Sequence, residues 1–436
     1  MTDGPMTDGP EIQRPVTKRP VKSRRNSRSE ILAPFEVRSF RFQWPADLMT
    51  SWASEMEILI LGWYILTETG SVLLLTLYGA LVYAGTLIAP LFGLWGDQFG
   101  HRNVLAAMRA SYAAAAALMT VAAMMHWLNA GVVFAIASIA GMVRPSDLAM
   151  RNALVAETMP GDRLMAAMGV ARTTADSARI FGALAGAGLF AMLGMAPAYA
   201  AITVVYAGGF LLTLGVGAPR HSRVIMARTS FWRDLREGLV YVYDSPASLA
   251  AMWLAFLINL TAYPLTLGLL PYVARDIYHV DQTGLGSLTA SFAAGGLIGS
   301  IGISFVGRSI RPARMMMIYA AAWYLALLGF VLAPGIGVGR VMLVLAGLAQ
   351  SLSMTPMAVM LLHGASAAFR GRVMGVRMLA VYGLPIGLIV AGWLIERLGF
   401  PVTAAAYCLV GLGLTIVIGA RWRAWLWPVD AAANQR

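Results

Sequence analysis

From about residue 45 onward, long apolar stretches alternate with short breaks rich in Gly, Pro or Arg. Each stretch is long enough for a helix that crosses a bilayer, which takes about 20 residues. Lipid offers no partners to backbone N–H and C=O groups, so stretches of this length must be helical. We predict twelve spans in two sets of six, at residues 46–67, 71–95, 103–127, 130–150, 165–193, 197–217, 248–273, 284–306, 314–334, 338–362, 373–395 and 400–420.

This pattern divides the chain into five parts. They are a disordered basic cytoplasmic tail (1–44), an N-terminal six-helix bundle (45–217), a cytoplasmic linker with an amphipathic helix (218–247), a C-terminal six-helix bundle (248–420) and a cytoplasmic C-terminal tail (421–436). The first tail has too little apolar surface to offset its ordering entropy, and it lacks the apolar core of a secretory signal. It is either a cytoplasmic tail retained by the positive-inside bias, or a segment that binds anionic lipid or acts as a localisation signal.

Composition excludes several classes of protein. The chain is 58% hydrophobic and 12% charged, against about 25% charged residues in soluble domains. A soluble enzyme, a nucleic-acid binder and a single-anchor receptor are therefore excluded. The single cysteine, Cys408, rules out a disulfide framework and a cysteine metal site. Because phosphate-loop and metal-ligand motifs are missing, we expect no enzyme activity, no cofactor and no metal.

The formal charge of +12 is mostly a matter of topology. With both termini inside, 25 of the 33 basic residues, Arg151 among them, fall in cytoplasmic segments. Only Arg275, Arg340 and Arg397 fall on the opposite side. This asymmetry follows the positive-inside rule, so we expect a multi-pass protein of the plasma or inner membrane with both termini cytoplasmic. Its partners are then the lipid bilayer and not nucleic acid.

The two halves repeat short motifs at a nearly constant offset. Thr69-Gly70 recurs as Thr283-Gly284, and Met168-Gly169-Val170 recurs as Met374-Gly375-Val376. Such parallel repeats are typical of transporters whose substrate path runs between the two halves. We therefore predict an all-α integral membrane protein of two pseudo-symmetric six-helix bundles.

One loop carries the strongest motif, Gly93-Leu94-Trp95-Gly96-Asp97-Gln98-Phe99-Gly100-His101-Arg102 between the second and third spans. It resembles the signature loop of the major facilitator superfamily, in which Gly93, Asp97, Gly100 and Arg102 are the matching positions. The resemblance implies that the loop latches against the start of span eleven, near Arg370, Arg372 and Arg377. The alternative is an ordinary charged turn.

Further stretches resemble the enterobactin-exporter-like branch of that superfamily. They include Gly62-Trp63-Tyr64-Ile65-Leu66-Thr67-Glu68-Thr69-Gly70-Ser71, Arg179-Ile180-Phe181-Gly182 and Leu270-Pro271. The resemblance implies proton-driven export of a small organic molecule, siderophore-like or drug-like, by a monomer. Gly182-Ala183 stands where that branch often has Gly-Pro, which puts the export direction in doubt. An importer, a differently coupled carrier and a non-transporting receptor or assembly protein remain alternatives.

Ionisable residues inside spans are functional candidates, because an unpaired charge costs several kcal/mol in the bilayer. The proton-coupling candidates are Glu55, Glu57, Asp147 and Asp176. Glu55 and Glu57 lie about 200° apart around a helix, so at most one of them points squarely into a central cavity. We favour Glu55, although both could lie near the aqueous rim.

The candidates for charge pairs or substrate contacts are Arg109, Arg144, Arg172 and Arg179. The spacing of Arg144 to Asp147, and of Asp176 to Arg172 and Arg179, predicts pairs on shared helix faces. Arg144 and Arg172 could bind an anionic group through their guanidinium forks. Equally, they could form buried pairs that only fix helix packing.

Overall fold

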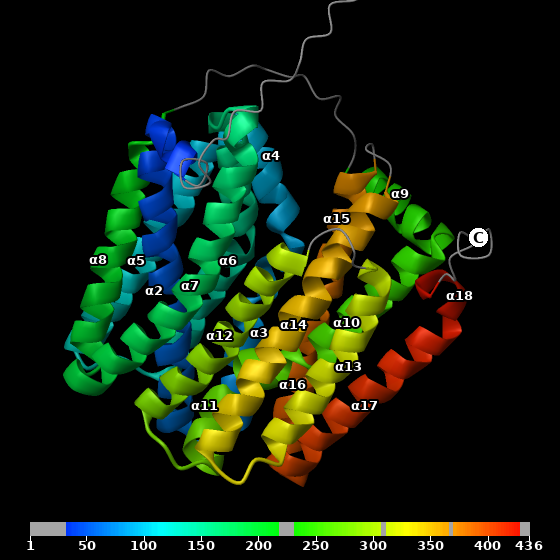
Figure 1. The fold of residues 1–436 in the computed structure, drawn as a ribbon. Coiled ribbons are helices and arrows are strands. Elements are labelled where there is room, and N and C mark those ends of the chain that lie inside the picture. The colour runs from blue at the N-terminus through cyan, green and yellow to red at the C-terminus, as the bar shows by residue number, and fades with distance from the viewer. Residues whose placement is uncertain (1–31, 218–230, 307–310, 366–368, 428–436) are drawn as a thin grey trace, which may run out of the picture.

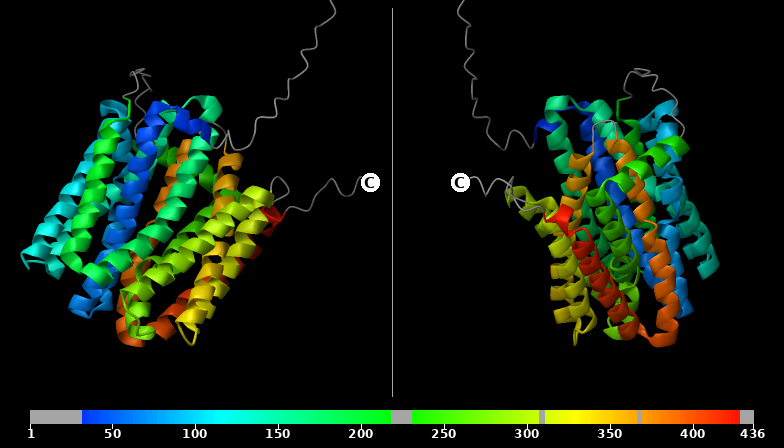
Figure 2. Two further views of the ribbon diagram at one scale, coloured as in Figure 1. Left: turned by 60° about the vertical axis from the view of Figure 1, so that its left-hand side comes forward. Right: turned by 90° about the vertical axis from the view of Figure 1, so that its right-hand side faces the viewer.

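The computed structural model describes residues 32–217, 231–306, 311–365 and 369–427, and these form helices joined by short turns (Figure 1). Two bundles of long helices lie side by side. Figure 2 shows from two further sides that the long helices of both bundles run alongside one another. The described part of the chain contains no strand.

The N-terminal bundle follows a short helix that precedes the first span. Its elements are η1 (Ala33–Glu36), α2 (Arg38–Thr69), α3 (Val72–Val82), η2 (Ala84–Leu87), α4 (Ala89–Phe99), α5 (His101–Met124), α6 (Ala130–Thr158), α7 (Gly161–Leu193) and α8 (Met195–Leu214). The second span is the broken unit α3–η2–α4, which bends by 47°.

The C-terminal bundle contains two broken spans, α10 to η4 and α15 to α16. Its elements, with the linker helix α9, are α9 (Phe231–Asp244), α10 (Pro246–Thr261), η3 (Pro264–Gly268), α11 (Leu270–Tyr272), η4 (Val273–Ile277), α12 (Gln282–Val306), α13 (Pro312–Val331), α14 (Ile336–Gly364), α15 (Arg370–Ala380), α16 (Gly383–Leu398), α17 (Phe400–Arg421) and α18 (Arg423–Leu426). The π-helical turns η3 and η4 begin at or follow a proline, which cannot supply a backbone N–H.

Ten helical segments of the described residues are long and apolar enough to cross a membrane, if α10 with η3 and α15 with α16 each count as one, and the bent unit of α3 and α4 makes eleven. The remaining long helix is α2, which has 32 residues and is less apolar because it carries four carboxylates. The arrangement is that of the predicted twelve-helix membrane protein, with α2 as the first span. The fold class predicted from the apolar pattern is confirmed.

Some boundaries differ from the prediction. Residues 32–44, which we assigned to a disordered tail, form η1 and the first turns of α2, and there Phe40 and Gln43 are buried. Span four extends past the expected end at 150 to Thr158, because the charged residues near that end are paired inside the protein. Residues 1–31, 218–230 and 428–436 of the predicted tails and linker lie outside the described residues.

The two bundles meet at the end remote from α4 and α15 (Figure 1). Gly286 of α12 packs against α7, and a Cβ there would lie 2.5 Å from the Cβ of Ala187. Gly392 of α16 packs against α3, and its Cβ would lie 2.0 Å from Oγ1 of Thr76. Only glycine permits backbones to approach this closely, so both contacts depend on it.

Polar contacts between the two bundles lie at the same end of the interface. The guanidinium of Arg275 donates to the carbonyl oxygen of Leu66, and the Ser71 hydroxyl lies 3.2 Å from Oε1 of Glu396. Nearer the middle, the Tyr382 hydroxyl donates to the carbonyl of Ala84 at 3.1 Å. Beyond that level the bundles stand apart in Figure 1, where α4 and α15 reach the upper end. The structure is therefore closed at one end of the bundle interface.

The linker helix α9 packs on the C-terminal bundle. Oε2 of Glu237 lies 2.9 Å from the guanidinium of Arg372, and the rings of Tyr241 and Phe369 stack with centroids 4.8 Å apart. These contacts attach α9 to α15, so the two helices belong to one packed unit.

Candidate functional site

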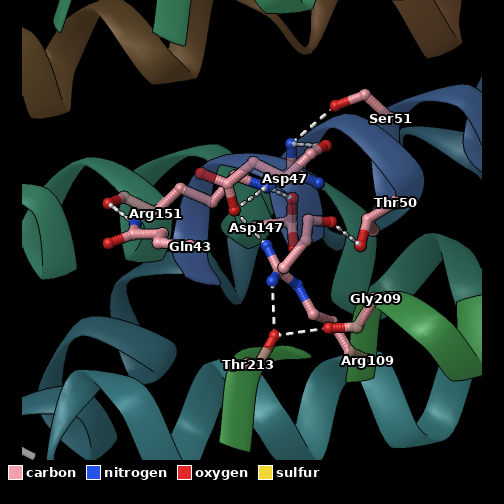
Figure 3. Close-up of polar contacts among 10 residues, drawn as sticks. Gln43, Asp47, Thr50, Ser51, Arg109, Asp147, Arg151, Gly209 and Thr213 are labelled. Atoms are coloured by element: carbon pink, nitrogen blue, oxygen red, sulfur yellow. Dashed lines mark hydrogen bonds and ion pairs between the residues drawn. The ribbon is translucent and has the colours of Figure 1, made fainter. Parts of the chain in front are cut away.

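A buried ionic network joins four helices of the N-terminal bundle (Figure 3). Asp47 of α2 accepts a hydrogen bond from the fully buried guanidinium of Arg109 on α5, which also donates to the hydroxyl of Thr213 on α8. Arg151 of α6 pairs with Asp147, and its Nε lies 3.7 Å from Asp47 Oδ1. Two carboxylates face two guanidiniums, so the formal charges balance within the bundle.

One face of α2 builds this network. Gln43, Asp47 and Ser51 follow each other at four-residue spacing and therefore lie on the same face. Nε2 of Gln43 donates to the carbonyl of Arg151 at 3.0 Å, and Arg151 donates to the Ser51 hydroxyl at 2.6 Å. The predicted topology places Arg151 among the cytoplasmic basic residues and Asp47 among the ionisable residues of span one. The four-residue spacing of Asp147 and Arg151 was the signal that could have identified the pair.

A second buried pair lies farther along α2. Glu57, which is 4% exposed, accepts hydrogen bonds from the guanidinium of Arg144 on α6 and, at 2.9 Å, from the hydroxyl of Tyr206 on α8. The ring of Tyr112 on α5 packs against Tyr206, with centroids 5.6 Å apart. Glu57 and Arg144 thus connect helices inside one bundle.

The predicted pairing of Arg144 with Asp147 is wrong. Although the two are three residues apart on α6, each takes a different partner: Arg144 binds Glu57, and Asp147 binds Arg151. Spacing along one helix identifies side chains that can meet, but it carries no information on the carboxylates that a neighbouring helix supplies. Here α2 supplies Glu57 to Arg144.

Between the bundles lies a cavity of about 480 Å³. Both bundles line it, through spans one, two, four and five of the first half and spans seven, eight, ten and eleven of the second. Its volume falls within the roughly 300–1,000 Å³ of small-molecule sites. The cavity is the candidate binding site.

Glu55 lines the cavity, whereas Glu57 does not. The carboxylate of Glu55 is 27% exposed and lies 3.6 Å from Nε of Arg179 on α7. Gly182 of α7 makes this placement possible, because a Cβ there would lie 2.9 Å from the Cβ of Glu55. Glu55 is thus a carboxylate that cavity water can reach and that has a single cationic neighbour in an ion pair among the described residues.

A second carboxylate, Asp176, also lines the cavity. Its side chain is 9% exposed and lies 3.2 Å from Nε of Arg172 one turn before it. Of the two arginines that spacing offered to Asp176, only Arg172 forms an ion pair with it in the described structure, and Arg179 faces Glu55. Arg172 also lines the cavity, and its side chain is 62% exposed.

The C-terminal bundle contributes one cation. Arg377 of α15 lines the cavity, and within residues 32–217, 231–306, 311–365 and 369–427 it makes neither an ion pair nor a hydrogen bond. Polar neutral groups lie in the same wall, where Nε2 of Gln350 donates to the Tyr263 hydroxyl at 3.0 Å. The resemblance to the signature loop implies only a place for Arg377 near the latch. Its position one turn inside the predicted span 373–395, away from the helix end, was the available signal.

The signature loop begins within α4 and turns into α5. Gly100, with φ of 88°, makes the turn in a conformation that side chains rarely adopt. Arg102 donates to the carbonyl of Val216 at 3.2 Å, which ties the loop to the end of α8. Oδ1 of Asp97 lies 3.8 Å from His101, and its side chain is 66% exposed. A Cβ at Gly93 would meet no atom within 4 Å, so close packing does not require a glycine there in this conformation.

The expected contact between Asp97 and span eleven is not formed in this conformation. In the described residues Asp97 pairs with His101, while Arg372 pairs with Glu237 and Arg377 faces the cavity. The bundles stand apart at this end, which separates α4 from α15 (Figure 1). The side chain of Arg370 lies outside the described residues.

The sequence pattern of the Major Facilitator Superfamily matches residues 45–386. The chain belongs to this superfamily. It is therefore a carrier of the secondary-transporter type, whose members bind small-molecule substrates. The apolar helices of the structure agree with a multi-pass membrane protein. Among curated proteins, no sequence matches the chain. The described residues contain no group of three or more His, Cys, Asp or Glu placed to hold a metal ion.

Solved structures share this fold at low sequence identity. The nucleoside transporter NupG is 15% identical, with a TM-score of 0.68, over 90% of this chain and 100% of that chain. A POT family transporter in complex with a thioalcohol-conjugated peptide is 13% identical, with a TM-score of 0.71, over 89% and 97%. The human organic anion transporter MFSD10 is 15% identical, with a TM-score of 0.61, over 88% and 100%. At these identities the likeness concerns the fold alone.

Proposed function

We propose that the chain is a proton-coupled secondary transporter that exports a small organic molecule by alternating access. The observation that carries this proposal is the cavity between the bundles, with Glu55 exposed to it and paired with Arg179. A carboxylate that exchanges an arginine partner for a proton can couple its ionisation to the state of the cavity. Glu55 is the residue we propose as proton carrier.

The other three acidic candidates have more restricted positions. Glu57 and Asp147 are held by arginines inside the N-terminal bundle, away from the cavity. Asp176 lines the cavity but is only 9% exposed beside Arg172. Each of these three carboxylates forms an ion pair with a guanidinium, so we assign them to charge neutralisation. Arg109 and Arg144 have the matching structural role, and Arg172 and Arg179 face the substrate.

We propose that both termini lie in the cytoplasm, because basic residues are concentrated on that side of the predicted topology. With this orientation, the closed end of the interface faces away from the cytoplasm, and the end with the signature loop faces the cytoplasm. The state described here is then the one that admits substrate from the cytoplasm. We propose that Gly93, Asp97, Gly100 and Arg102 form the latch that closes this end in the opposite state.

Export is proposed on the sequence resemblance to the enterobactin-exporter-like branch, and import is the alternative in the same fold. The test is a flux screen of siderophore-like and drug-like compounds in proteoliposomes of known orientation with an imposed pH gradient. We expect a compound to move from the cytoplasmic face when protons move the other way. Movement of the compound together with protons would establish the importer instead. A receptor would show binding with no flux under any gradient.

A further inference from the structure

The charges that line the cavity do not balance. Its described lining holds two carboxylates and three guanidiniums, namely Glu55, Asp176, Arg172, Arg179 and Arg377. Two of the guanidiniums are paired, Arg179 with Glu55 and Arg172 with Asp176. One formal positive charge is left over, and it resides on Arg377 of the opposite bundle. By contrast, the buried pairs inside the N-terminal bundle balance.

We propose that the cavity binds a small organic anion between Arg377 of α15 and Arg172 of α7. This inference rests on the proposed transport function and names its substrate class. An unpaired guanidinium within a membrane span costs several kcal/mol unless water or an anion accompanies it, so such residues mark ligand sites. A planar guanidinium presents donors that match a carboxylate, sulfonate or phosphate.

Arg172 is suited to be the second partner. Its Nε is directed to Asp176 at 3.2 Å, while the side chain as a whole remains 62% exposed. Nε is the atom that forms the ion pair with Asp176, so we assign the terminal amino groups of Arg172 to the ligand. Because Arg172 and Arg377 belong to different bundles, an anion held by both would connect the two halves that must move against each other.

The rest of the cavity lining suits the carbon skeleton of an organic ligand. Apolar and aromatic groups, among them Leu59, Phe292 and Tyr263, alternate with the amides Asn259 and Gln350. Such a mixture of apolar surface with a few polar groups is typical of small-molecule sites. An inorganic ion would leave this apolar surface uncovered. A cationic ligand would meet the surplus positive charge and bind less well.

The test is equilibrium dialysis of the purified full chain with three naphthalene probes that share one ring system and differ in charge. These are naphthalene-2-sulfonate, the neutral naphthalene-2-sulfonamide and the cationic 2-naphthylmethylammonium. We expect the sulfonate to bind about tenfold more tightly than the other two, as hydrogen bonds to charged groups allow. R377Q should remove this preference, and R377K should restore part of it. R397Q is the matched control, because Arg397 stacks on Trp393 and does not line the cavity.

An equal affinity for all three probes would overturn the anion site, and so would binding of none of them. Retention of the sulfonate preference in R377Q would do the same. This binding test is independent of the transport proposal, because equilibrium dialysis of the purified protein uses no lipid bilayer and no ion gradient. Sulfonate binding that depends on Arg377, combined with no flux of any compound, would support the anion site and contradict the transport proposal.

Discussion

Glu55 and Glu57 lie two residues apart on α2, yet Glu55 faces the cavity between the bundles and Glu57 is buried against Arg144 and Tyr206. Their separation of about 200° around the helix places them in different environments. We therefore expect the same substitution at the two positions to have different effects, one on coupling and the other on stability.

Glu57→Gln should destabilise the protein. The neutral amide leaves the Arg144 guanidinium without its counter-charge in a buried site, and breaking such a pair costs about 3–5 kcal/mol. Thermal unfolding of the purified protein should show a clear loss of melting temperature. Glu55→Gln should cost much less, because Glu55 is partly exposed and 3.6 Å from Arg179. Equal melting temperatures for the two variants would contradict this assignment.

The Asp47–Arg109 pair should show strong coupling in a double-mutant cycle. Asp47→Asn and Arg109→Gln should each lower the stability by about 3 kcal/mol, since each leaves a buried charge alone. The double variant should lose less than the sum of the two, because no unpaired charge remains. The control pair is Glu36 with Arg163 at 2.8 Å, whose carboxylate is 68% exposed. There we expect at most about 1 kcal/mol. Additive losses at Asp47 and Arg109 would show that the two do not interact.

Gly392→Ala should open the closed end of the bundle interface. The added Cβ would lie 2.0 Å from Oγ1 of Thr76 and 3.1 Å from Cα of Leu73, so α16 and α3 must separate. Spin labels at positions 71 and 396, in a Cys408→Ser background, should report longer distances. Gly413→Ala is the control, because nothing lies within 4 Å of its Cβ. An unchanged distance distribution in Gly392→Ala would refute the role of this contact.

The positions of most spans were predictable, because the length of each apolar stretch decides where a membrane-spanning helix can lie. The predicted sixth to eighth spans differ from α8, the α10 to η4 unit and α12 by a few residues. The end of α6 was not predictable in this way. Arg151 looks like a loop charge until its partners Asp147 and Asp47 are known, and apolar length cannot supply a partner.

The candidate site was predictable only in part. The rotation of α2 follows from helical geometry, so the separation of Glu55 from Glu57 could be derived from their spacing. The pairing of Arg144 with Glu57 could not, because it depends on how α6 packs against α2. The position of Arg377 in the cavity wall depends likewise on the rotation of α15.

Asp97→Asn should slow turnover and leave the melting temperature unchanged. Asp97 is exposed and lies 3.8 Å from His101 in this state, so its charge contributes little to stability here. If the loop latches against span eleven in the opposite state, loss of the charge weakens that state alone. Asp162→Asn is the control, because Asp162 is 70% exposed on α7, outside the loop. Flux through Asp97→Asn at the wild-type rate would exclude the latch.

The most direct test of the central claim measures proton movement in proteoliposomes that contain a pH-sensitive dye. When a transported compound is added without a pH gradient, the wild-type protein should change the internal pH. Glu55→Gln should still exchange labelled for unlabelled compound, because its cavity is intact, but it should produce no pH change. Compound-dependent proton movement at the wild-type rate in Glu55→Gln would contradict proton coupling through Glu55.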